Sequence, residues 1–277
     1  MNENKPLTAL NRLSIVIALV TLALGFTYII PTASNPSMTN LLGFLINVNI
    51  DVYSFVPVFI SILAFAGTLW VLKSNPFVIE SKATVLQLTA NVMLPVFSVL
   101  VLSITLREMS RNEVWWVVYI LGAFLFGLVV IAEYTVLDIS KTQHPLATIG
   151  LIGLSHALFL ILTIVLKTSN MRLYLVLPVL LLACAFVSVR TINLRLNGSG
   201  NSEYVVLVCL IIVQLAIAFY YLFLNPIQYG LLLTGVLYAI LSFACGLITK
   251  LPKRDLLTEP LVMAVITLAM VVIVGLN

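Results

Sequence analysis

The strongest constraint on this chain is a series of apolar runs, each about as long as a bilayer is thick, separated by short polar breaks. A helix rises about 1.5 Å per residue, so about 20 apolar residues cross a hydrocarbon core of about 30 Å. Strands of a membrane barrel would alternate apolar and polar residues, and these runs do not alternate. The runs therefore predict an all-α, polytopic bundle of transmembrane helices.

Composition argues against a soluble fold, because 62% of the residues are hydrophobic and only 9% are charged. A soluble domain carries about 25% charged residues. We predict eight or nine spans in a single membrane domain over residues 1–277, without a soluble domain. The nine runs are Leu13–Ile30, Val52–Leu72, Thr84–Leu106, Val114–Leu137, Leu146–Leu166, Tyr174–Asn193, Tyr204–Leu224, Gln228–Thr249 and Leu256–Val274.

Two segments need a separate interpretation. Lys5 and Arg12 precede the first run as in a signal peptide, but the run is longer than a typical signal core and no clean cleavage site follows it. We therefore expect a retained first helix. The stretch Leu41–Asp51 would make the next span too long for one crossing, and we expect a short interfacial helix there.

Lysine and arginine favour the cytoplasmic side of a membrane. With a cytoplasmic N-terminus, ten of them lie on that side and four on the other, namely Arg107, Arg111, Lys167 and Arg172. The charge pattern predicts a multi-pass protein of the cell membrane with its N-terminus in the cytoplasm and its C-terminus outside. The net charge of +4 is spread over the loops, so we expect no nucleic-acid partner.

Two long segments resemble each other and indicate an internal repeat. "HPLATIGLIGLSHALFLILTIVLK" begins at His144 and "NPIQYGLLLTGVLYAILSFACGLITK" at Asn225. Weaker echoes upstream suggest three units of three helices, at residues 12–106, 113–195 and 203–277. An odd number of spans per unit inverts each successive unit in the membrane, as in many transporters.

Glu133 is the clearest candidate for a binding site, because a carboxylate in hydrocarbon costs several kcal/mol unless it is protonated, paired or hydrated. It lies about 7 Å inside the predicted fourth span, and Arg190 lies at a comparable depth in the sixth. Arg190 either reaches the headgroups or pairs with Glu133, and the pair either fixes helix packing or forms an ion- or proton-coupling site. The repeat places Phe219 at the position of Glu133.

His156 is the third candidate, near the middle of the fifth span. A histidine at this depth can relay protons, bind a cofactor or contact an anion, but a neutral imidazole bonded to a helix carbonyl or hydroxyl is commoner. His144 lies about 18 Å away along the same helix, which excludes a metal or haem shared by the two within one chain. Asn91 is among the polar residues expected to form hydrogen bonds between helices.

No catalytic motif is present, and the three cysteines show no metal or redox spacing. We expect no catalytic residues, no bound metal and no cofactor. The sequence favours a non-enzymatic accessory or scaffold subunit of a membrane complex, with the lipid bilayer and other membrane subunits or a second copy as partners. Alternatives are a small-solute or lipid transporter with a polar site at Glu133 and Arg190, and a membrane enzyme acting on a lipid or isoprenoid.

Overall fold

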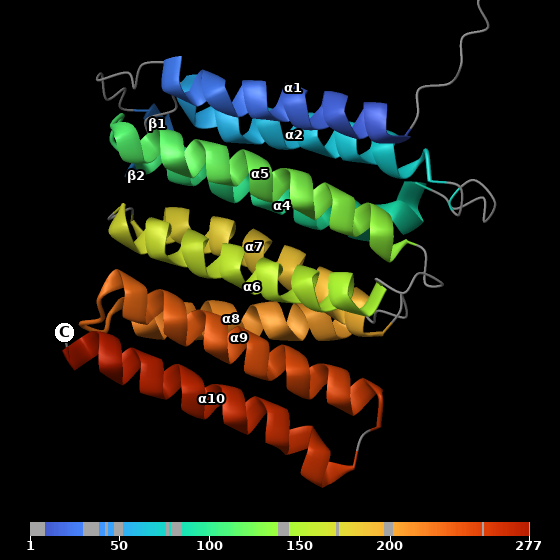
Figure 1. Ribbon diagram of the computed structural model, residues 1–277. Coiled ribbons are helices and arrows are strands. Elements are labelled where there is room, and N and C mark those ends of the chain that lie inside the picture. Colours follow the sequence, from blue (N-terminus) through green and yellow to red (C-terminus); the bar gives the residue numbers. More distant parts are fainter. Residues whose placement is uncertain are drawn as a thin grey trace, which may run out of the picture.

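The computed structural model describes residues 9–29, 39–41, 44–46, 52–75, 78, 85–137, 144–169, 172–196, 202–250 and 252–276. Within these ranges the chain forms nine long helices and one small pair of strands (Figure 1). The elements are α1 (Ala9–Ile29), β1 (Thr39–Leu41), β2 (Phe44–Ile46), α2 (Val52–Leu72), α4 (Val85–Glu108), α5 (Glu113–Val136), α6 (His144–Thr168), α7 (Leu173–Arg195), α8 (Ser202–Tyr220), α9 (Pro226–Ile248) and α10 (Lys253–Leu276).

All nine helices in the described part of the chain are long and apolar enough to cross a membrane. The prediction of about nine spans is confirmed, and the protein is a multi-pass membrane protein. Helix ends differ from the predicted ones by a few residues, because terminal turns fray and loop residues near an apolar run are hard to assign. The three repeat units at 12–106, 113–195 and 203–277 stay a prediction.

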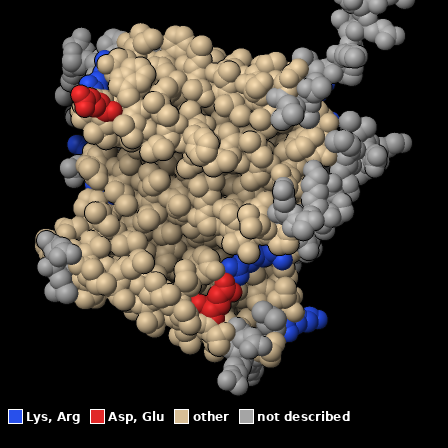
Figure 2. Space-filling model, viewed as in Figure 1, with Lys and Arg blue, Asp and Glu red and all other residues tan. Residues whose placement is uncertain are grey.

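Successive helices run in opposite directions, so the two ends of the bundle are distinct (Figure 1). We call the end at which α1 begins the N-terminal face and the end at which α10 finishes the far face. Figure 2 shows charged side chains near these two ends and an uncharged surface between them. A band without charges is what a protein surrounded by acyl chains requires.

The helix expected within Leu41–Asp51 is wrong where the structure describes this stretch. Thr39–Leu41 and Phe44–Ile46 pair as antiparallel strands instead, with Thr39 opposite Ile46. Only two residues separate the strands, and one of them is Gly43, which is the sequence signal for a hairpin. Backbone pairing across the strands satisfies polar groups that a helix of this length would leave open at both ends.

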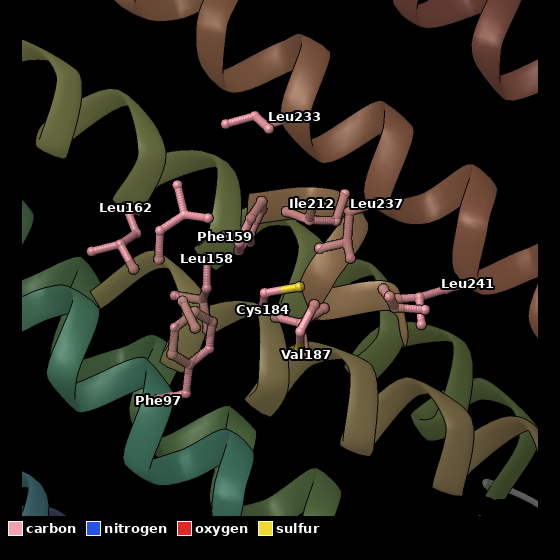
Figure 3. Packing of buried hydrophobic residues seen from close by; sticks show 14 of the residues in the cluster. Phe97, Leu158, Phe159, Leu162, Cys184, Val187, Ile212, Leu233, Leu237 and Leu241 are labelled. Atoms are coloured by element: carbon pink, nitrogen blue, oxygen red, sulfur yellow. The ribbon is translucent and has the colours of Figure 1, made fainter. Parts of the chain in front are cut away.

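Buried side chains form two clusters that meet at α4 and α5. The first joins α1, α2, α4 and α5 and includes Val20, Ala64 and Phe126. The second, shown in Figure 3, joins α4 with α6 to α9 around Cys184 and Leu237. Since α4 contributes side chains to both clusters, it holds the first helices of the chain against the rest.

Helix α10 lies at the edge of the bundle and packs mainly against α9 (Figure 1). Gly235 on α9 allows this close approach, because a Cβ atom at that position would collide with Thr267 of α10. At the far face, Gln228 Nε2 donates to the Val271 carbonyl of α10 at 3.2 Å. Among the described side chains of α10 only Thr267 and Val271 are buried within the chain, so the outward faces of this helix can contact lipid or a partner.

Candidate functional site

Glu133 and Arg190 lie one to one and a half helical turns from the N-terminal face, on α5 and α7. Glu133 is three residues before the end of α5 and Arg190 five residues before the end of α7. Both residues lie within helices and not in the loops that follow, so the helices carry the two charges into the bundle. The antiparallel order of the spans places both helix ends at the same face, as the sequence predicted.

The two side chains form a bidentate ion pair. Arg190 Nε donates to Glu133 Oε1 at 2.8 Å, and Arg190 Nη2 donates to Glu133 Oε2. The side chains are 2% and 0% exposed, respectively, so water does not screen the pair. Two parallel charge-assisted hydrogen bonds fix the guanidinium relative to the carboxylate in both distance and direction. The pairing interpretation of Arg190 is therefore correct and the headgroup interpretation is wrong.

A third helix completes this contact. Arg190 Nη1 donates to Asn91 Oδ1 of α4 at 2.7 Å, and α4 packs against both α5 and α7. The interhelical hydrogen bond expected of Asn91 is thereby confirmed. Near the same end, Asn75 Nδ2 donates to the Tyr134 carbonyl at 3.0 Å and ties the segment after α2 to α5. We call Glu133, Arg190 and Asn91 the inner polar contact.

His156 does not belong to the inner polar contact. Its Nδ1 lies 2.8 Å from the Ile152 carbonyl of its own helix, so this nitrogen carries the proton and donates it. Its ring meets that of Tyr238 on α9 edge to face, with 5.2 Å between the ring centroids. Nε2 is buried and has no hydrogen-bond partner in the described part of the chain. The neutral imidazole bonded to a helix carbonyl is the arrangement that the sequence favoured.

Sequence reasoning missed a second set of polar side chains, which consists of Tyr238 and two residues nearer the N-terminal face, Arg195 and Glu259. Arg195 Nη2 lies 2.8 Å from Glu259 Oε1 and 3.1 Å from the Tyr238 hydroxyl, which donates to Glu259 Oε1 at 2.6 Å. They come from α7, α9 and α10, and we call them the outer polar contact. Glu259 falls inside a predicted span, which is the same signal that identified Glu133.

The outer polar contact is more accessible than the inner one. The Arg195 side chain is 21% exposed and that of Glu259 is 46% exposed. Figure 2 shows opposite charges side by side near the end of the bundle where the helices of this contact meet. In the described part of the chain, no group of three or more His, Cys, Asp or Glu side chains could hold a metal ion.

A groove of about 700 Å³ lies between α5 and α6. Its lining residues are Leu128, Val129, Ile131, Ala132, Thr135, Leu146, Ala147, Gly150, Leu151 and Leu154. We call it the α5–α6 groove. On α5 its lining residues lie on both sides of Glu133 in sequence, but neither charge of the inner polar contact lines it. A smaller cavity of about 210 Å³ lies between α4 and α6 at the far face.

No curated protein and no solved structure matches the chain. A protein-family profile matches residues 33–274, a stretch that contains both polar contacts and the α5–α6 groove. The matched stretch includes eight of the nine long helices of the described chain and leaves out α1. The chain belongs to the family described as "Protein of unknown function (DUF5656)".

Proposed function

We propose that the protein is a non-enzymatic accessory or scaffold subunit of a membrane complex. The inner polar contact carries this proposal, because Glu133 and Arg190 neutralise each other and hold α4, α5 and α7 together. A transporter or an acid–base enzyme needs such groups to meet a substrate, whereas a scaffold needs them to fix helix positions. The pairing supports the second use.

The position of α10 adds support. This helix packs against α9 and exposes apolar side chains such as Val262, Val265 and Ile273. Between helices in lipid, association depends on close packing and hydrogen bonds instead of the hydrophobic effect. A peripheral helix with most of its surface outside its own bundle is well placed to pack against a transmembrane helix of another subunit.

The test is the composition of the particle in its own membrane. We expect the chain of 30.4 kDa, extracted in polymer nanodiscs without detergent, to be found with a second protein at fixed stoichiometry. Val265→Trp on α10 should release that protein, whereas Phe124→Trp on α5 should not, although both side chains are 65% exposed. A particle with one protein chain, or equal behaviour of the two variants, would contradict the proposal.

A lipid or small-solute transporter is the second candidate, and the α5–α6 groove beside Glu133 favours its lipid form. It predicts that protein in phosphatidylcholine vesicles moves a fluorescent phosphatidylcholine between leaflets and that Glu133→Gln stops this movement. The scaffold function predicts that vesicles with wild-type protein, with the variant and without protein behave alike. Movement that depends on Glu133 would replace the first proposal by the second.

For orientation, we propose that the N-terminal face is cytoplasmic. The basic residues in helices or at helix ends on that face are Arg12, Lys73, Arg190, Arg195, Lys250, Lys253 and Arg254, whereas those at the far face are Arg107, Arg111, Lys167 and Arg172. The excess of basic residues on the first side supports the assignment. Reporter enzymes fused after Lys250 and after Arg111 should be active on opposite sides of the cell membrane, and the reverse pattern would invert the orientation.

A further inference from the structure

The α5–α6 groove is a recess of about 700 Å³ that neither polar contact fills. We propose that it binds one acyl chain of a phospholipid from the leaflet at the N-terminal face. This inference goes beyond the scaffold function and does not depend on it, because a subunit with or without partners is surrounded by lipid.

The position of the groove along the helices matches one leaflet. On α5 it runs from Leu128 to Thr135, next to the last helical residue, and on α6 from Leu146, close to the helix start, to Leu154. These stretches are about 10 to 12 Å long at about 1.5 Å per residue. Half of a hydrocarbon core is about 15 Å, so the groove starts at the headgroup boundary and ends near the midplane.

The groove lining is apolar along this whole length. The only side chain in it with a polar atom is Thr135, and its hydroxyl donates to the Ile131 carbonyl of its own helix at 2.9 Å. Water gains no hydrogen bonds from such a surface, and an apolar recess of this kind stays dry. The occupant is therefore a hydrocarbon, and at this depth of a bilayer the abundant hydrocarbon is an acyl chain.

The cross-section of the groove fits a chain better than a helix. Val129 and Leu151 form its base and are 0% and 1% exposed, whereas Leu128, Ile131 and Leu146 stand at its rim and are 48%, 47% and 80% exposed. A volume of about 700 Å³ over a length of about 10 to 12 Å corresponds to a mean cross-section of about 60 to 70 Å², which is less than the roughly 80 Å² of a helix about 10 Å across. The projecting rim would hold a helix away from the base but leaves room for an acyl chain.

Gly150 offers a way to fill the groove without disturbing the fold. A Cβ atom at Gly150 would have no neighbour within 4 Å, and the same holds for Gly153, one turn further along α6. Gly150 lines the groove and Gly153 does not. Leucine at either position adds the same apolar volume to the same helix, so the two variants form a matched pair.

The experiment uses the full chain in palmitoyl-oleoyl-phosphatidylcholine vesicles that contain a phosphatidylcholine with a diazirine midway along one acyl chain. After illumination, mass spectrometry locates the labelled peptides. We expect stronger labelling of the groove stretches of α5 and α6 than of the exposed stretch around Val265 on α10. Gly150→Leu should lower the labelling of the groove about fivefold, because the leucine side chain displaces the acyl chain from several of its contacts with the groove lining. Gly153→Leu should leave the labelling unchanged.

Ala147→Leu, on the same wall of the groove, provides a second variant and should lower labelling in the same direction. All three variants should melt within a few degrees of the wild type, which shows that a loss of labelling is not a loss of fold. Equal labelling of wild type, Gly150→Leu and Ala147→Leu would overturn the proposal. So would an interchain disulfide formed by Leu146→Cys, because a second copy would then occupy the groove.

Discussion

The inner and outer polar contacts use the same chemistry in different surroundings. Each pairs an arginine near the end of α7 with a glutamate of another helix, Arg190 with Glu133 and Arg195 with Glu259. The inner pair is fully enclosed and joins central helices, whereas the outer pair is partly exposed and joins the peripheral α10. Because solvent and headgroups screen exposed charges, the two pairs should differ in their contribution to stability by severalfold.

The largest effect is expected when one partner of the inner pair is removed. Arg190→Met leaves Glu133 buried without a counter-charge, and such a change costs about 3–5 kcal/mol of unfolding free energy. Thermal unfolding in nanodiscs measures the loss. The double variant Glu133→Leu with Arg190→Met should recover most of it, because it leaves no buried charge; a double variant as unstable as the single one would show that the pair is not the cause.

A smaller loss is expected at the third member of the inner polar contact. Asn91→Leu leaves one donor of Arg190 without its acceptor, and a lost hydrogen bond to a charged group costs about 1.5–3 kcal/mol. Ser98→Ala is the control on the same helix, because that hydroxyl donates to the Pro95 carbonyl of α4 itself at 2.7 Å. Equal melting temperatures for the two variants would show that the hydrogen bond between Asn91 and Arg190 does not stabilise the protein.

Removing one charge of the outer pair should lower the unfolding free energy only slightly. Glu259→Gln removes a charge that is 46% exposed and keeps an oxygen for Arg195 and Tyr238. Exposed pairs contribute about 0.2–1 kcal/mol, so we expect a loss in this range by the same unfolding assay. A loss as large as that of Arg190→Met would mean that the membrane interface shields the outer pair as completely as the inner one.

The smallest effect is the response to salt. Raising the salt concentration from about 0.05 M to about 0.5 M shortens the screening length to a few ångströms and weakens exposed pairs. A double-mutant cycle between Arg195 and Glu259 should show its coupling energy fall by a few tenths of a kcal/mol, whereas the cycle between Arg190 and Glu133 stays constant. A salt-dependent inner cycle would indicate that water reaches Glu133.

The two pairs also show which features of the protein can be predicted from its sequence and which cannot. Helix positions were predictable because the length of an apolar run is a local property. Matched depth in two spans made a pair of Glu133 and Arg190 one of two expected arrangements, and the structure shows the pair. Asn91 was expected to bond another helix but could not be assigned to Arg190, since helix neighbours depend on how the whole bundle packs. The α5–α6 groove depends on side-chain volumes across two helices and has no signature in either one.

Two further differences between the prediction and the structure have separate causes. The prediction missed the strands Thr39–Leu41 and Phe44–Ile46 because it interpreted the apolar residues of this segment as a short helix. The two-residue connection that contains Gly43 favours a hairpin instead. Glu259 was overlooked although it met the criterion applied to Glu133. Its partner Arg195 counts in the sequence only as a charge near the membrane surface, and their contact depends on how α9 and α10 pack at the edge of the bundle.

The inner ion pair has a consequence for biosynthesis. Arg190 follows Glu133 by 57 residues, so a ribosome that adds about 5–20 residues per second makes the arginine about 3–11 seconds after the glutamate. During this interval the arginine that pairs with the carboxylate in the folded protein has not yet been made, and we expect α5 to stay at the edge of the translocation channel until α7 arrives. An arrest-peptide assay should record a pulling force on the nascent chain when α7 inserts, and this force should disappear in Glu133→Leu. An unchanged force in the variant would show that α5 enters the bilayer without α7.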